Sequence, residues 1–215
     1  MKDPSQRILL IFMLLGICLT TGCAYIAVGT KLAPIEPPRP SFQPRVEHTV
    51  GDFSFKLEGG AIATSKFTGR LLNYNILSSW KRRGYICDER YIESGSFSRT
   101  ADYNLTLSGS QYGKSSIIMQ ILSGLTLTLL PYTVTTEWDI RYTVEDVKNG
   151  KNYSASVQES YESYVELFLV FTFPVATRNY RETIQRIGDH LYNELYSQGA
   201  FQQSAAAAGE SPGKK

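Results

Sequence analysis

The clearest pattern in the chain is an alternation of apolar and polar residues over 132–145. The apolar and aromatic set comprises Tyr132, Val134, Thr136, Trp138, Ile140, Tyr142 and Val144. A period of two predicts a long β-strand with one buried face and one solvated face. Asn149-Gly150, a pair typical of hairpin turns, follows this segment. Residues 153–161 then alternate again, so we expect an antiparallel partner strand.

Three shorter strands and two helices complete the predicted elements. The strands are expected at 50–57, 85–92 and 103–107. The first helix is expected over 65–83, ending at Gly84, with a broad apolar stripe made of Phe67, Leu71, Leu72, Tyr74, Ile76 and Trp80. The last helix begins at Thr177 or Asn179, and its apolar line is Tyr180, Ile184, Ile187, Leu191 and Leu195.

The predicted order is strand, helix, four strands, helix. Each helix has one apolar face, and so has the sheet. Burying these faces together predicts an α+β fold, a mainly antiparallel five-stranded sheet with two helices packed on one face. This arrangement loosely resembles the small lipoprotein subunit of the lipopolysaccharide-assembly machine and the auxiliary lipoproteins of transporters.

Two apolar runs, 117–130 and 165–175, do not fit an amphipathic sheet. Both are too short to span a membrane as helices. Because the first leads into the long strand and the second leaves its antiparallel partner, both emerge at one end of the sheet. They either continue the strands as buried β-structure covered by the two helices, or pack on each other, or form an exposed apolar surface that contacts a membrane or a partner protein. The side chains of that surface would be Leu125, Leu127, Leu129, Phe168, Phe171 and Phe173.

The N-terminal segment has the features of a secretory signal peptide. Lys2 and Arg7 precede an uncharged apolar stretch over 8–19, and small residues close the segment. The apolar stretch is shorter than the roughly 20 residues that a membrane-spanning helix needs. We therefore expect residues 1–22 to be removed as a signal peptide.

The end of this segment, Leu19-Thr20-Thr21-Gly22-Cys23, resembles the lipobox of bacterial lipoprotein precursors. It departs from the usual pattern at Thr20, because the family's leucine stands one place earlier, at Leu19. The resemblance implies cleavage before Cys23 and attachment of fatty acyl chains such as palmitate there, which would anchor the protein to a membrane. In enteric bacteria an aspartate after the cysteine retains the protein in the inner membrane. Ala24 therefore favours the outer membrane, with the domain facing the periplasm.

Four regions are expected along the chain. Residues 1–22 are the signal peptide, and 23–49 carry five prolines and are predicted to be an extended tether. The alternative for this segment is a strand-free arm packed along the domain. Residues 50–198 form the periplasmic domain, and 199–215 are predicted to be a disordered tail.

Composition excludes several classes of function. Removing 1–22 leaves 20 basic and 19 acidic residues, a balance that argues against nucleic-acid binding. Cys87 would be the one remaining unmodified thiol, and no histidine has metal-ligand spacing to it, so neither a disulfide nor a metal site is expected. We expect no cofactor, and no small-molecule ligand other than lipid.

Enzyme signatures are missing from the sequence. The segment Gly109-Ser-Gln-Tyr-Gly113-Lys114-Ser115 has one residue too few between its glycines for a phosphate-binding loop, and we interpret it as a turn. Two acidic pairs, Glu137 with Asp139 and Asp88 with Glu89, are interpreted as solvated surface. We expect no catalytic residues, although acids clustered in a cleft, or a histidine there, would favour a hydrolase.

These observations predict a non-enzymatic envelope lipoprotein whose domain binds a protein partner or scaffolds an envelope complex. The alternative is a lipid-handling or transport-accessory lipoprotein that uses the apolar runs 117–130 and 165–175. A continuous apolar cavity under the helices would favour lipid carriage, whereas a solid core would favour protein contact.

Overall fold

The structure of the chain is a computed structural model. It describes residues 24–60, 62–93, 96–98, 100–126, 132–166 and 173–202. Within this part, no helix is both long and apolar enough to cross a membrane.

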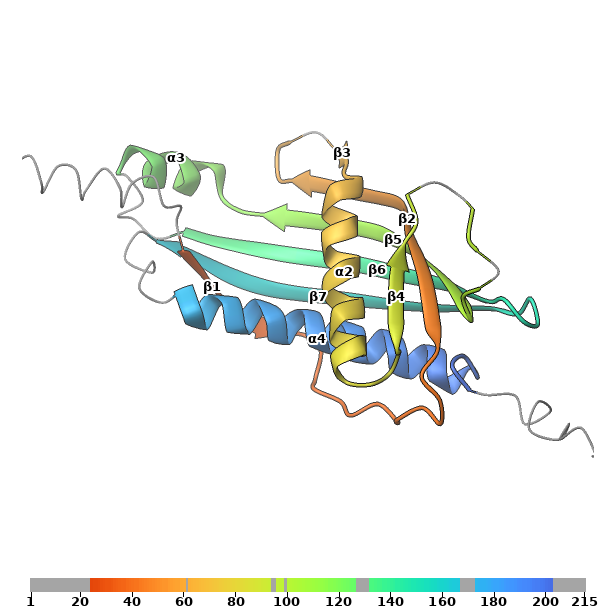
Figure 1. Ribbon diagram of the computed structural model, residues 1–215. Coiled ribbons are helices and arrows are strands. Elements are labelled where there is room, and N and C mark those ends of the chain that lie inside the picture. The colour runs from red at the N-terminus through yellow and green to blue at the C-terminus, as the bar shows by residue number, and fades with distance from the viewer. Residues whose placement is uncertain are drawn as a thin grey trace, which may run out of the picture.

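Among the described residues, seven strands form one sheet and three helices accompany it (Figure 1). The strands are β1 (Ala24–Thr30), β2 (Arg45–Leu57), β3 (Ala63–Thr64), β4 (Asp88–Tyr91), β5 (Tyr103–Lys114), β6 (Tyr132–Asp146) and β7 (Asn152–Glu166). The helices are α2 (Lys66–Arg82), α3 (Ile117–Leu125) and α4 (Phe173–Ser197). The strand order is β1-β7-β6-β5-β2-β3, and β4 pairs with β2 outside this path.

The expected α+β class is confirmed, but the sheet is mixed rather than purely antiparallel. Strand β2 pairs in parallel with both β4 and β5. The intervening helix α2 returns the chain to the end at which β2 began, and this crossover makes the pairing parallel. The sheet is also wider than the predicted five strands, because β1 and β3 add to its two edges.

The hairpin of β6 and β7 follows the predicted alternation. Trp138, Ile140 and Tyr142 are buried on the inner face, while Asp139 and Arg141 between them are exposed. The strands pair from Tyr132 with Val165 to Glu145 with Asn152. This long, regular ladder joins the central strand β6 to β7.

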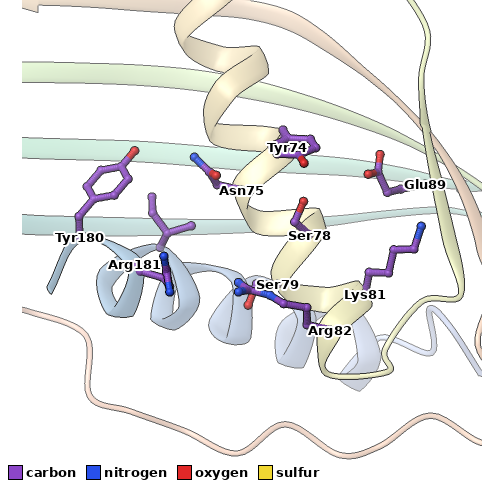
Figure 2. Close-up of a pocket in the computed structure, with 10 residues that line it drawn as sticks. Tyr74, Asn75, Ser78, Ser79, Lys81, Arg82, Glu89, Tyr180 and Arg181 are labelled. Atoms are coloured by element: carbon purple, nitrogen blue, oxygen red, sulfur yellow. The ribbon is translucent and has the colours of Figure 1, made fainter. Parts of the chain in front are cut away.

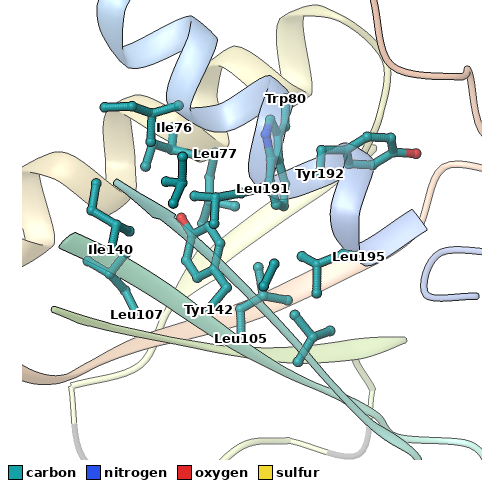
Figure 3. Close-up of a cluster of buried hydrophobic side chains, with 14 of the residues drawn as sticks. Ile76, Leu77, Trp80, Leu105, Leu107, Ile140, Tyr142, Leu191, Tyr192 and Leu195 are labelled. Carbon is teal, nitrogen blue, oxygen red and sulfur yellow. The ribbon is translucent and has the colours of Figure 1, made fainter. Parts of the chain in front are cut away.

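Helices α2 and α4 cover one face of the sheet, as expected (Figure 1). Ser65 caps α2 by accepting a hydrogen bond from the Thr68 N–H at 3.2 Å, and Gly84 ends the helix with φ of 74°. The core between helices and sheet is filled by large side chains (Figure 3). They include Ile76, Leu77, Trp80, Leu105, Leu107, Ile140, Tyr142, Leu191, Tyr192 and Leu195, all fully buried.

The predicted apolar stripe of α2 proves to be two stripes. Leu72, Ile76 and Trp80 are buried, but Phe67, Leu71 and Tyr74 point away from the core and are 77%, 49% and 54% exposed. A helix turns by about 100° per residue, so these two sets lie on nearly opposite sides. One side of α2 packs in the core, and the other presents apolar side chains to the outside.

Strand β5 continues through residues 109–114 of the segment 109–115 that was predicted to be a turn. Gly109 lies inside this strand, opposite Ile140, with φ of 150°. A side chain on Gly109 would collide with the backbone oxygen of Asp139. The glycine thus allows close strand contact beside the irregular register of β2 between Val50 and Phe53. The turn prediction was wrong because a glycine can serve either purpose.

The segment predicted to be a tether over 23–49 is instead packed on the domain where the structure describes it. Ala24–Thr30 is strand β1, paired with β7, and Leu32 and Phe42 pack against the core. The buried carboxylate of Glu159 accepts hydrogen bonds from the N–H groups of Lys31 at 2.8 Å and Leu32 at 3.4 Å. Residues 31–44 lie along the domain without a strand, whereas Ala24–Thr30 and the residues from Arg45 onward are strands of the sheet.

The domain also extends past the predicted boundary at residue 198. Ala200 and Phe201 are fully buried, and the Phe201 ring stacks on Tyr192 with centroids 5.4 Å apart. The Phe201 N–H donates to the Tyr103 hydroxyl at 3.1 Å. The polar composition of the tail concealed this single aromatic anchor. Residues 203–215 lie outside the described part.

Candidate functional site

Helix α3 forms an exposed apolar surface at one end of the sheet. Its six large apolar side chains are exposed to between 36% and 77%; they are Ile117, Ile118, Met119, Ile121, Leu122 and Leu125. The helix contacts the start of β6 and extends beyond the sheet (Figure 1). The interpretation of 117–130 as buried β-structure is therefore wrong for 117–125. The pairing of β5 with β6 ends at Lys114, and the apolar run continues beyond it as a helix.

Of the six predicted contact residues, Leu125 is placed on this surface, with 77% of it exposed. Phe173 is the first residue of α4, and its side chain is outside the described part. The other four, Leu127, Leu129, Phe168 and Phe171, also lie outside it, as does Cys23. The first apolar run leads into the start of β6, and the second run leaves the end of β7. These two strand ends lie side by side at one end of the sheet, since Tyr132 pairs with Val165.

A second exposed surface lies on the outer side of α2. We call it the α2 surface, and it consists of Phe67, Arg70, Leu71 and Tyr74. It borders a cleft of about 360 Å³ whose other walls are His48, Glu89 and Tyr91. The Arg70 guanidinium lies 4.2 Å from the centre of the Tyr91 ring, a cation–π contact that holds it at the rim.

The floor of this cleft is fixed by a chain of hydrogen bonds from the core. The Tyr142 hydroxyl donates to Asn73 Oδ1 at 2.6 Å, and Asn73 Nδ2 lies 3.0 Å from His48 Nδ1. Because the Asn73 amide donates there, the proton of the neutral ring is on Nε2, which lies 3.0 Å from Glu89 Oε2. Burial lowers the pKa of His48 below its ordinary 6.5, outweighing the opposite effect of Glu89.

This histidine lies in a cleft beside an acid, the arrangement that would favour a hydrolase. Its side chain is only 2% exposed, however, and both ring nitrogens are engaged by Asn73 and Glu89. A general base needs a nitrogen within reach of a substrate proton. The geometry therefore suits a structural role, in which His48 ties α2 to β2 and β4.

A larger groove of about 690 Å³ runs between α2 and α4 (Figure 2). Tyr74, Ser78 and Arg82 line it from α2, and Tyr180 and Arg181 line it from α4 (Figure 2). It therefore continues from the α2 surface across the helix pair. Tyr74 lines both hollows.

Of the acidic pairs identified in the sequence, Glu137 and Asp139 lie together on the outer face of β6, whereas Asp88 and Glu89 face different partners. Glu137 forms an ion pair with Lys114 at 2.7 Å, and the neighbouring Asp139 is exposed on the outer face. Asp88 pairs with Lys81 at 2.9 Å, whose ammonium lowers the pKa of that carboxyl. Glu89 points to His48 instead. In the described part, no three metal-ligating side chains are grouped to hold an ion.

The α2 surface was missed in the sequence because its residues were assigned to the core. The spacing of Phe67, Leu71 and Tyr74 is i, i+4, i+7, which by itself describes one complete helix face. Leu72, Ile76 and Trp80 describe another. The predicted apolar stripe was too wide for one helix face, and this width was the signal that α2 has two apolar faces.

Comparisons with known proteins do not assign this chain to a family. No family model and no curated protein matches the chain. Solved structures are similar to it at low identity. A PelC dodecamer from Paraburkholderia phytofirmans is 12% identical, covers 76% of this chain and 98% of its own, and has a TM-score of 0.38.

Two further structures are comparably distant. Protein XCC0632 from Xanthomonas campestris is 9% identical over 78% of this chain and 92% of its own, with a TM-score of 0.39. A protein from Helicobacter pylori, described as a neuraminyllactose-binding hemagglutinin homolog, is 8% identical over 76% and 91%, with a TM-score of 0.36. These similarities are too remote to assign a function.

Proposed function

We propose that this chain is a lipoprotein anchored to the outer membrane through Cys23, and that its periplasmic domain binds a protein partner through the α2 surface. The anchor is supported by the lipobox-like sequence before Cys23. The partner is supported by the exposure of Phe67, Leu71 and Tyr74 on an otherwise well-packed helix.

The exposed side of α2 is the observation that carries the partner proposal. Aromatic residues and arginine are enriched at protein interfaces, and they dominate binding energy when they line a pocket. Phe67, Arg70 and Tyr74 are of these types, and they surround the cleft floored by His48. The hydrogen-bonded floor is rigid, so a partner would meet a preformed site.

Lipid carriage is the second candidate, and the core opposes it. The space under α2 and α4 is occupied by Trp80, Tyr142 and Tyr192, whose side chains are fully buried. Acyl chains would have to displace this aromatic cluster. What favours a lipid-related role is the exposed α3 alone, which lies outside the core.

Photo-crosslinking in cells tests the partner proposal. A photoreactive phenylalanine analogue is placed at Leu71 or at Tyr74, and in a matched control at Thr143, which is exposed on the helix-free face of the sheet. We expect a discrete protein adduct from 71 and 74 and none from 143. The substitution Leu71→Asp should remove the adduct formed at 74 without unfolding the domain, because Leu71 is half exposed.

Two outcomes would overturn the partner proposal. One is an equal yield of adducts at 71, 74 and 143, which would indicate random encounters. The other is capture of phospholipid alone from 71 and 74, which would favour the lipid-handling alternative.

A further inference from the structure

Helix α3 has a composition that suits lipid better than protein. Its nine residues carry no charge and no aromatic ring, and its exposed side chains are isoleucine, leucine and methionine. Aliphatic side chains of this kind resemble acyl chains, whereas protein-binding centres favour tyrosine, tryptophan and arginine. The α2 surface has the aromatic and arginine residues typical of a protein-binding centre, whereas α3 has the aliphatic residues that resemble acyl chains.

The length of α3 fits one leaflet of a bilayer. Nine residues at a rise of about 1.5 Å span roughly 14 Å, about half the thickness of the hydrocarbon core. The helix is therefore too short to cross a membrane and long enough to lie within the outer part of one leaflet. An apolar segment this short is compatible with a position at the membrane interface rather than with a membrane span.

The sheet places the start of the described chain at the same end as α3. Ala24 pairs with Glu166 of β7, and Tyr132 of β6 pairs with the neighbouring Val165. Strand β5, which leads into α3, ends one strand further across, where Lys114 pairs with Thr135. Strands are spaced by about 4.8 Å, so Ala24 and the end of β5 are roughly 14 Å apart across the sheet, and the registers offset them by roughly 13 Å along the strands.

No slack separates Cys23 from this end of the sheet. Cys23 is bonded directly to Ala24, and Ala24 is already paired in β1. A long tether would have let the domain turn any surface toward the membrane. Because the arm is packed instead, acyl chains on Cys23 would hold the α3 end of the domain against the bilayer.

Among the residues near α3 are tyrosines and lysines, which are common at membrane interfaces, together with Glu58 and Glu137. Tyr164, next to the end of β7, is 42% exposed, and Lys56 and Lys114 lie close to the Tyr112 ring at 5.5 and 5.4 Å. The β2–β3 turn touches α3, since a side chain on Gly59 would lie 3.0 Å from Ile117. Tyrosine and lysine favour the headgroup region because they combine an apolar body with a polar or charged tip.

We infer that α3 is a membrane-seating helix, which inserts into the same leaflet that holds the acyl chains of Cys23. The occupant of this surface is thus the lipid bilayer. The inference rests on the proposed anchor, and it leaves the α2 surface free in the periplasm, on the helix side of the sheet. Anchor and α3 together would make two attachment points and fix the orientation of the domain.

Depth-dependent fluorescence quenching tests this inference. In a Cys87→Ser background, single substitutions Ile118→Cys, Ile121→Cys or Leu125→Cys receive an environment-sensitive fluorophore, and Lys151→Cys, exposed at the opposite end of the sheet, serves as control. The lipidated protein is reconstituted into phosphatidylethanolamine–phosphatidylglycerol vesicles that carry nitroxide groups on their acyl chains. We expect labels on α3 to be quenched at least threefold more than the label at 151.

A second arm separates this inference from the anchor. The mature chain carries a hexahistidine tag directly before Ala24 in place of Cys23 and is held on vesicles by nickel-chelating lipids. If Cys23 proves unmodified in cells but α3 labels are quenched on these vesicles, the anchor fails and the seating helix stands. Labels quenched no more than the control in both arms would overturn it. A blue-shifted emission shows that a label is in apolar surroundings. If lipid nitroxides do not quench such a label on α3, those surroundings are protein rather than lipid, and this result would also overturn the inference.

Discussion

The indole N–H of Trp80 donates a hydrogen bond of 2.9 Å to the backbone oxygen of Gly188, and so joins the two helices that cover the sheet. A side chain on Gly188 would lie 3.1 Å from the same nitrogen, which explains the glycine at this crossing. The Trp80 ring also contacts Tyr142, Tyr192 and Phe201. The contact is central to the packing of the domain.

Replacing this tryptophan should cost more stability than replacing the other one in the chain. Trp80→Phe removes a buried hydrogen bond and leaves a small void, for which we expect a loss of about 2–4 kcal/mol. Trp138 is also buried, but its N–H has no partner among the described residues. Trp138→Phe should therefore cost at least about 1 kcal/mol less. Urea denaturation followed by circular dichroism measures both, and equal losses would contradict the role assigned to Trp80.

The buried C-terminal aromatic makes a second prediction. Phe201→Ala should lower the free energy of unfolding by about 3–5 kcal/mol, because it empties a site enclosed by Tyr103, Tyr192 and Trp80. Phe67→Ala, the same change on an exposed phenylalanine, should cost less than about 1 kcal/mol. Thermal and urea unfolding compare the two variants. Similar small losses would restore the interpretation that the domain ends before residue 199.

The packed arm depends on the buried carboxylate of Glu159. Glu159→Ala leaves the N–H groups of Lys31 and Leu32 without their acceptor, at a cost of about 1–3 kcal/mol. Trypsin should then cut after Lys31 several-fold faster than in the native protein. Glu162→Ala, on the outward face of the same strand, should leave the rate unchanged. Equal rates in all three proteins would mean that the arm is not held at this point.

The buried histidine predicts a loss of stability at mildly acidic pH. Because burial lowers the pKa of His48 in the folded protein, the unfolded chain takes up the proton more readily as pH falls below 6.5. Glu89 favours the charged ring and Arg70 opposes it, but burial is the largest effect. The free energy of unfolding should fall between pH 7 and 5, by up to about 1 kcal/mol per pH unit.

Substitution of His48 supplies the control for this effect. His48→Gln keeps a polar group toward Asn73 or Glu89 but cannot take up a proton. We expect it to be less stable than the native protein at pH 7 and to show a shallower decline between pH 7 and 5 in urea titrations. An identical slope in the two proteins would assign the pH dependence to other groups.

The spacing of apolar residues, every second residue in strands and every third or fourth in helices, correctly predicted the elements that bury one face. The alternation over 132–145 and the line through Ile184, Ile187 and Leu191 both proved correct, because each describes packing against a single core. The prediction failed where a residue serves a second purpose. Gly109 permits close strand contact rather than a turn, and Phe67 and Leu71 face outward on a helix that also packs inward.

The two candidate surfaces were predictable to different degrees. An exposed contact surface at 117–130 was one of two interpretations, since an apolar run by itself is compatible with burial or exposure. Only the fold shows that α3 leaves the sheet and that Ala24 lies at the same end. The packed arm was concealed by its prolines, whose extended geometry suits a tether and a docked segment equally well.

The most direct test of the whole account is the mass of the mature N-terminus isolated from bacterial membranes. The proposed orientation of the domain depends on acyl chains on Cys23, so we predict a first peptide that begins at Cys23 and carries three fatty acyl chains. A first peptide with a free thiol at Cys23, or one that begins at another residue, would contradict it.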